Sequence, residues 1–91
     1  MKKIIQDNYD SIVKRGLITT STTRNEFLDK LFEEVAELEQ AEINNDWGNM
    51  CEELADVILV CLNWAKHYNI DIEAELIAKI KKNQTRPRHV P

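Results

Sequence analysis

Apolar residues recur every three or four positions along most of this chain, which is the spacing of one face of an α-helix. Polar turn residues interrupt the pattern at Gly16, at Asn44–Asp46 and at Asn69. The chain has only two glycines and two prolines, which favours a helical bundle over a sheet protein. The sequence therefore predicts an all-α fold in a single domain, residues 1–91, with four helices over about 3–14, 24–42, 47–67 and 72–83.

The predicted helices begin at polar residues that commonly cap helix N-termini. Thr23 and Glu26 have the spacing of a capping box, in which each side chain accepts a hydrogen bond from the other residue's backbone N–H. Asp46 and Asp71 are suitable N-caps for the third and fourth helices. Beyond the fourth helix, Pro87 prevents the helix from continuing.

One segment of the third helix, Val57–Leu62, is apolar on every side. A helix of that kind is either buried centrally or covered by a second chain. A chain of 91 residues also forms only a small hydrophobic core by itself. We therefore expect a homo-oligomer, either a homodimer or a homotetramer, with the third helix near the interface between copies.

Two pairs of acidic residues lie where the second and third helices are otherwise apolar: Glu34 with Glu37, and Glu53 with Asp56. At about 100° per residue, Glu34 and Glu53 point into the apolar arcs, and their partners lie at the edges. The i, i+3 spacing presents the two carboxylates of each pair from neighbouring turns. Carboxylates facing a core are costly unless they are paired or bind a metal. The pattern therefore predicts a metal site inside a helical bundle.

The residue types at this site indicate which metal it would hold. Carboxylate oxygens select a hard cation such as Mg²⁺ or Mn²⁺. A di-iron site in a helical bundle would require Glu-x-x-His motifs, but neither His67 nor His89 follows a Glu at that spacing. Hard divalent cations held by carboxylates are typical of enzymes that act on phosphates.

Charge and composition limit the expected partners and location. The net charge of −4 argues against general nucleic-acid binding, which usually needs a basic face. No apolar run approaches the roughly 20 residues of a membrane helix, and no secretory signal follows Met1. Cys51 and Cys61 would lie about 15 Å apart along one helix, too far for a disulfide. We therefore expect a cytoplasmic protein with no nucleic-acid or membrane partner.

Three motifs along the chain occur together in one known family. Two are acidic and lie on the second and third predicted helices: Glu33-Glu34-x-x-Glu37 and Glu53-x-x-Asp56. The third is the C-terminal stretch Lys79-x-x-x-Asn83-x-x-Arg86-Pro87. With these motifs the sequence resembles the MazG-like all-α nucleoside triphosphate pyrophosphohydrolases over nearly its whole length. The final residues, 88–91, depart from the family pattern because they lack the glycine that often follows.

The resemblance implies a four-helix MazG-like bundle that hydrolyses a nucleoside triphosphate, NTP or dNTP, to the monophosphate and pyrophosphate. Such an activity serves nucleotide-pool housekeeping. The implied cofactor is Mg²⁺, for which Mn²⁺ can substitute, and four residues match the family's metal ligands: Glu34, Glu37, Glu53 and Asp56. One of these four or Glu33 would orient the attacking water, and Glu33 is our candidate. Three residues match positions that engage the substrate's phosphates or the edge of the site: Lys79, Asn83 and Arg86.

Alternative interpretations stay open at this point. Lys79 and Asn83 share a helix face and can address one phosphate group, and Arg86 can add a bidentate contact. A solvated basic turn, favoured by the helix dipole, explains the same residues without a substrate. For the whole chain, the alternative enzyme is a phosphoribosyl-ATP pyrophosphohydrolase, a related bundle of histidine biosynthesis. The alternative from another class is a non-catalytic helical adaptor whose acidic residues bind a basic partner, without dependence on metal.

Overall fold

The computed structural model describes residues 1–85 of the chain. This part consists of four α-helices and contains no strand: α1 (Lys2–Lys14), α2 (Arg24–Ile43), α3 (Trp47–His67) and α4 (Ile72–Gln84). The all-α prediction is confirmed, and each predicted helix end lies within one residue of the observed end. The predictions for Arg86 and for the tail after it concern residues outside the described part of the chain.

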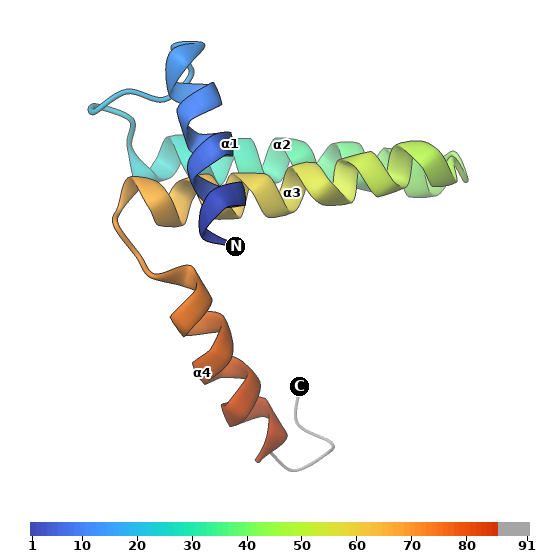
Figure 1. Ribbon diagram of the computed structural model, residues 1–91. Coiled ribbons are helices and arrows are strands. Elements are labelled where there is room, and N and C mark those ends of the chain that lie inside the picture. The colour runs from blue at the N-terminus through green and yellow to red at the C-terminus, as the bar shows by residue number, and fades with distance from the viewer. Residues whose placement is uncertain (86–91) are drawn as a thin grey trace.

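The two long helices α2 and α3 pack side by side as an antiparallel hairpin, and α1 crosses this hairpin (Figure 1). The buried apolar residues come from both long helices and from the loop after α1: Ile18, Phe27, Ala41, Val60, Leu62 and Ala65. The rings of Phe27 on α2 and Trp64 on α3 are stacked, with centroids 6.1 Å apart. The hairpin therefore supplies most of the buried core of the described residues.

Side-chain caps fix where the helices begin. Thr23 and Glu26 form the predicted capping box: the Thr23 backbone N–H donates to Glu26 Oε2 at 2.7 Å, and the Glu26 N–H donates to Thr23 Oγ1 at 3.3 Å. Asp46 and Asp71 each accept a hydrogen bond from the backbone N–H three residues later. After α1, Gly16 adopts φ +74°, a left-handed conformation that glycine takes without steric cost.

Polar contacts fasten α1 to the hairpin. The Tyr9 hydroxyl lies 2.8 Å from His67 Nδ1, and His67 Nε2 lies 3.1 Å from the carbonyl oxygen of Thr22. Because a carbonyl oxygen only accepts, His67 donates from Nε2. One residue of α3 thus holds both α1 and the loop before α2.

The fourth helix leaves the end of α3 and projects away from the hairpin (Figure 1). The Cα radius of gyration is 15.2 Å, compared with about 12 Å for a compact domain of this length. Three apolar side chains of α4 are 43–55% exposed: Leu76, Ile77 and Ile80. The hairpin also exposes Phe32 and Leu54. No helix within residues 1–85 is long and apolar enough to cross a membrane.

Candidate active site

The four predicted metal ligands meet between the two long helices. Glu34 and Glu37 lie on α2, whereas Glu53 and Asp56 lie on α3. One carboxylate oxygen from each of Glu34, Glu53 and Asp56 lies within 4.8 Å of the other two, and the same holds for Glu33, Glu34 and Glu37. Glu34 belongs to both groups and is therefore the centre of this acidic cluster.

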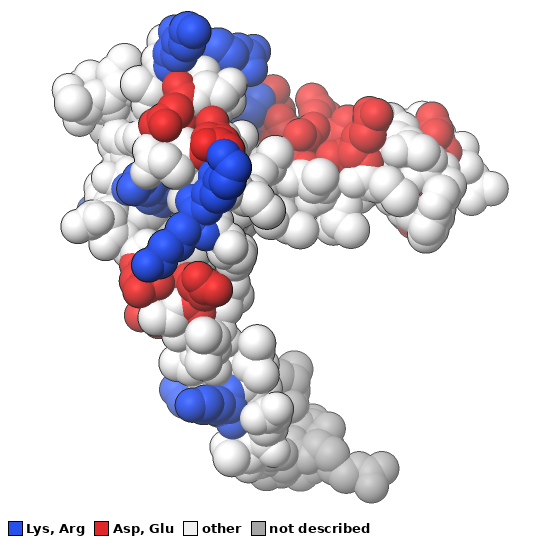
Figure 2. Space-filling model, in the orientation of Figure 1, with Lys and Arg blue, Asp and Glu red and all other residues white. Residues whose placement is uncertain are grey.

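Burial differs among the members of the acidic cluster in the way that the helical arcs predict. Glu34 is buried, with 6% of its surface exposed, and Glu53 is half-buried. Glu37 and Asp56, at the edges of the arcs, are exposed. The cluster is thus open on one side, and Figure 2 shows acidic side chains gathered along the α2–α3 hairpin.

Two carboxylate oxygens in the acidic cluster are enclosed by protein and have no hydrogen-bond partner when all the neighbouring carboxyl groups are ionised: Glu34 Oε2 and Glu53 Oε2. A buried acceptor without a partner typically costs about 1–3 kcal/mol, and more when it is charged. A divalent cation between the helices would satisfy both oxygens and relieve the repulsion among the carboxylates. The residues therefore fit a hard cation, and the all-oxygen set suits Mg²⁺ or Mn²⁺.

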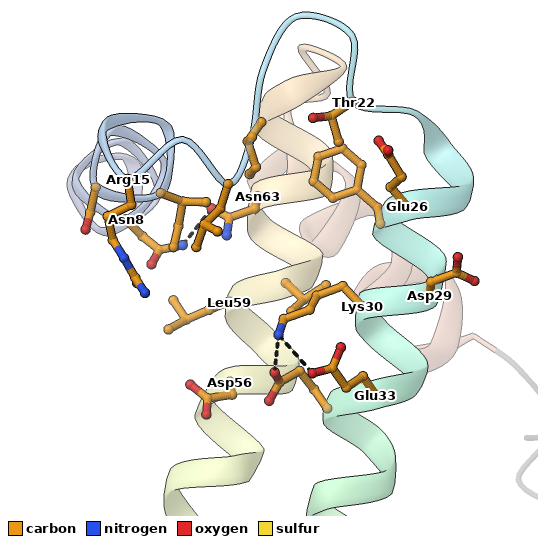
Figure 3. Close-up of a pocket in the computed structure, with 17 residues that line it drawn as sticks. Asn8, Arg15, Thr22, Glu26, Asp29, Lys30, Glu33, Asp56, Leu59 and Asn63 are labelled. Atoms are coloured by element: carbon orange, nitrogen blue, oxygen red, sulfur yellow. Dashed lines mark hydrogen bonds and ion pairs between the residues drawn. The ribbon is translucent and has the colours of Figure 1, made fainter.

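Lys30 on α2 provides the positive charge that the acidic cluster contacts in this structure (Figure 3). Its Nζ lies 3.0 Å from Glu34 Oε1 and 3.4 Å from Glu33 Oε1. The hydrogen bond to Glu34 raises the pKa of Lys30 above its usual value. Lys30 is not among the site residues predicted from the sequence, although its i, i+4 spacing to Glu34 is a recognisable signal.

The close approach of the carboxylates changes the acidity of Glu37. Its hydrogen bond to Glu34 and the negative charge of Glu34, followed by contact with Glu53, raise the pKa of Glu37 from 4.5 to about 7. Two carboxyl groups that hydrogen-bond to each other share one proton, which is why the pKa of one rises. A metal that binds all these carboxylates must displace that proton.

The raised pKa of Glu37 predicts how pH affects the metal-free protein. Between about pH 4.5 and 7, the folded state holds a proton on Glu37 that the unfolded state has released. Stability from this group is therefore present at the lower pH and is lost as the pH rises toward 7. We expect the melting temperature without metal to fall over this window, and the fall to be smaller in Glu37→Gln, which cannot ionise. Equal pH dependence in the two proteins would contradict the assignment.

A pocket of about 770 Å³ lies between α1, α2 and α3 and reaches the acidic cluster. Asp56, Glu33 and Glu34 line one end, and Lys30 projects into its middle (Figure 3). The size is in the range of ligand pockets, which is about 300–1,000 Å³. A substrate in this pocket would thus lie next to the carboxylates of the acidic cluster.

The predicted substrate-binding residues of the fourth helix are not at this pocket. Lys79 and Asn83 are exposed on α4, which packs only against α3 among the described helices. The geometry in one chain therefore does not bring them together with the acidic cluster. Arg86, the third of these residues, lies outside residues 1–85, so its position is not described.

Comparison with known proteins shows which family this sequence matches. The sequence matches the MazG nucleotide pyrophosphohydrolase domain over residues 22–91. No curated protein and no solved structure gives a significant match. The matched region contains the acidic cluster and α4, and α1 precedes it. Because the match spans most of the sequence, the chain belongs to the MazG nucleotide pyrophosphohydrolase family.

Proposed function

We propose that this protein is a Mg²⁺-dependent hydrolase that cleaves the bond between the α- and β-phosphates of a nucleoside triphosphate, NTP or dNTP. The products are the nucleoside monophosphate and pyrophosphate. The observation that carries the proposal is the pair of enclosed, partnerless oxygens on Glu34 and Glu53. They belong to an acidic cluster that borders a ligand-sized pocket through Glu34 and Asp56. Family membership supports nucleotide pyrophosphohydrolysis in general. Nucleotide-pool housekeeping in the cytoplasm is the corresponding role.

In this proposal the acidic cluster holds the metal through four residues: Glu34, Glu37, Glu53 and Asp56. A bound Mg²⁺ supplies charge neutralisation for the triphosphate and a water of lowered pKa. Glu33, exposed beside the cluster, orients the attacking water. Lys30 pairs with Glu34 in this structure, and with a cation held there its ammonium group would be available to contact a phosphate oxygen.

We also propose that a second copy of the chain completes the site, as a homodimer or homotetramer. The exposed apolar residues of α4 and of the hairpin leave two surfaces that a second copy can cover. Lys79 and Asn83 lie on the same α4 and do not reach the acidic cluster of their own chain. Packing α4 on a second hairpin would bring these two residues, and Arg86 after them, to the partner's triphosphate.

Two other functions are separable from this one by experiment. A phosphoribosyl-ATP pyrophosphohydrolase would use the same cluster but would release pyrophosphate only from that substrate. An adaptor would bind a basic partner without metal, and it would leave the enclosed oxygens of Glu34 and Glu53 without a role. The decisive assay is pyrophosphate release from canonical and modified nucleotides with Mg²⁺ and with chelator. Release from none of them, phosphoribosyl-ATP included, would refute the hydrolase.

Metal binding is expected to stabilise the folded protein. Mg²⁺ at ten times its dissociation constant adds about 1.4 kcal/mol to the free energy of unfolding, because it binds only the folded state. For a domain of this size that corresponds to a melting temperature about 5–10 °C higher. Differential scanning fluorimetry at constant ionic strength measures the change, with Na⁺ as the control salt. An unchanged melting curve at saturating Mg²⁺ would count against the metal site.

A further inference from the structure

The pocket beside the acidic cluster has one wall that the family match does not include. Asn8, Ser11 and Ile12 of α1 line this pocket, together with Arg15 directly after the helix. They precede residue 22, where the match to the MazG domain begins. The carboxylate end of the pocket therefore lies within the matched region, whereas the α1 wall lies outside it.

A hydrogen-bonded pair of carboxamides crosses the pocket end away from the acidic cluster. Asn8 Nδ2 on α1 donates to Asn63 Oδ1 on α3 at 2.6 Å (Figure 3). Asn63 is buried, with 8% of its surface exposed, and the apolar residues Leu62 and Ala65 near it on α3 are buried as well. A polar side chain in such surroundings is costly unless its groups are satisfied.

The single bond between the two amides leaves hydrogen-bonding capacity on both. A carboxamide has two N–H donors and an oxygen with two lone pairs, so Asn63 retains its donors and Asn8 retains its acceptor. Both residues line the pocket. The pair can thus offer one donor and one acceptor side by side, which is the complement of the polar edge of a nucleobase.

The space between the two ends of the pocket suits the rest of a nucleoside. Apolar side chains of Ile12, Leu59 and Val60 line the same pocket. Leu59 lies between Asp56 and the Asn8–Asn63 pair in Figure 3. Apolar side chains with a few placed polar groups, here including Lys30, are the usual lining of a small-molecule site.

We propose that this pocket holds the nucleoside half of the substrate, and that the Asn8–Asn63 pair binds the polar edge of the base. The proposal rests on the hydrolase function above, since it places the phosphates at the acidic cluster. It makes α1 the element that sets base preference. Tyr9 and His67 keep α1 in place independently of the amide pair, so Asn8 can be replaced without releasing the helix.

Replacing Asn8 by Asp tests the pair by removing the donor that it offers to the pocket, which leaves two acceptors. A carboxylate only accepts, so Asn63 must turn its NH₂ group toward residue 8 and present its oxygen to the pocket instead. The ratio of kcat/KM between the preferred base and the next one is expected to change by about tenfold or more. Asn25→Asp, the same chemical change at an exposed residue of α2 that does not line the pocket, is the matched control and should change this ratio little. An equal loss for every nucleotide in Asn8→Asp would overturn the proposal.

A binding measurement on the unaltered protein separates this proposal from the hydrolase function. Adenosine, guanosine, cytidine, uridine and thymidine are each added while the side-chain NH₂ signals of Asn8 and Asn63 are followed by NMR. We expect one or two nucleosides to move these signals and Mg²⁺-pyrophosphate to leave them nearly unchanged. No movement with any nucleoside at millimolar concentration would overturn the pocket assignment even if pyrophosphate is released. Selective movement in a protein that hydrolyses nothing would support the pocket and refute the hydrolase instead.

Discussion

Replacing Glu53 by Gln is expected to lower Mg²⁺-dependent pyrophosphate release on the order of 100- to 1,000-fold. Glutamine keeps the volume of the side chain but removes a negative charge from the proposed metal ligands. No N–H or hydroxyl group donates to Glu53 Oε2, and glutamine keeps an oxygen to which a protonated Glu37 can donate. The substitution also removes one member of a group of mutually repelling carboxylates. Activity should therefore be lost while the melting temperature without metal stays the same or rises.

The matched control is Glu39→Gln, on the same helix as Glu34 and Glu37 but exposed and outside the acidic cluster. It removes the same charge from the chain, so a general electrostatic effect would appear in both variants. We expect Glu39→Gln to leave activity and melting temperature nearly unchanged. Full Mg²⁺-dependent activity in Glu53→Gln would show that Glu53 is not a ligand.

The sequence allowed the helices and the acidic cluster to be predicted because both depend on local spacing. Helix starts follow from residues such as Thr23 and Asp46, whose side chains bond backbone groups only three positions away. The position of Glu34 on the apolar arc of its helix likewise predicted that it would be buried. Convergence of the two acidic pairs required only that α2 and α3 pack against each other through their apolar faces.

The α1 side of the pocket was not predictable in the same way. Asn8 and Asn63 are 55 positions apart, and nothing in the local pattern of either helix indicates that they meet. The only signal was a single Asn within an apolar stretch of the third helix. Such a residue indicates a buried hydrogen bond but does not identify the partner. The way α1 packs on the hairpin makes Asn8 that partner.

The direction of α4 was also beyond the reach of the sequence pattern. Asp71 and the apolar spacing predicted a helix, but they do not determine whether it folds back onto α2 and α3. In the structure it projects away, with Ile77 and Ile80 exposed. Periodicity identifies an apolar face, whereas the surface that covers this face lies elsewhere in the chain or in another chain.

A second large effect is expected if each active site is formed by two chains. Glu53→Gln removes a metal ligand, and Lys79→Ala removes a cation proposed to act on the partner's substrate. Each variant alone should be nearly inactive. A mixed dimer contains one chain of each variant. One of its two sites then has both substitutions, and the other has an unaltered acidic cluster and an unaltered Lys79. Mixing equal amounts with subunit exchange should therefore restore about one quarter of the parent activity.

The control mixes Glu53→Gln with Glu34→Gln, two variants whose defects lie in the same acidic cluster of the same chain. No pairing of these chains produces an intact site, so no activity should return. Analytical ultracentrifugation of the parent should show a dimer or a larger assembly at micromolar concentration. If the parent is a monomer, or if Glu53→Gln with Lys79→Ala stays as inactive as the control mixture, α4 does not serve a partner's site. Lys79 would then be better explained as part of a solvated basic turn at the end of its helix.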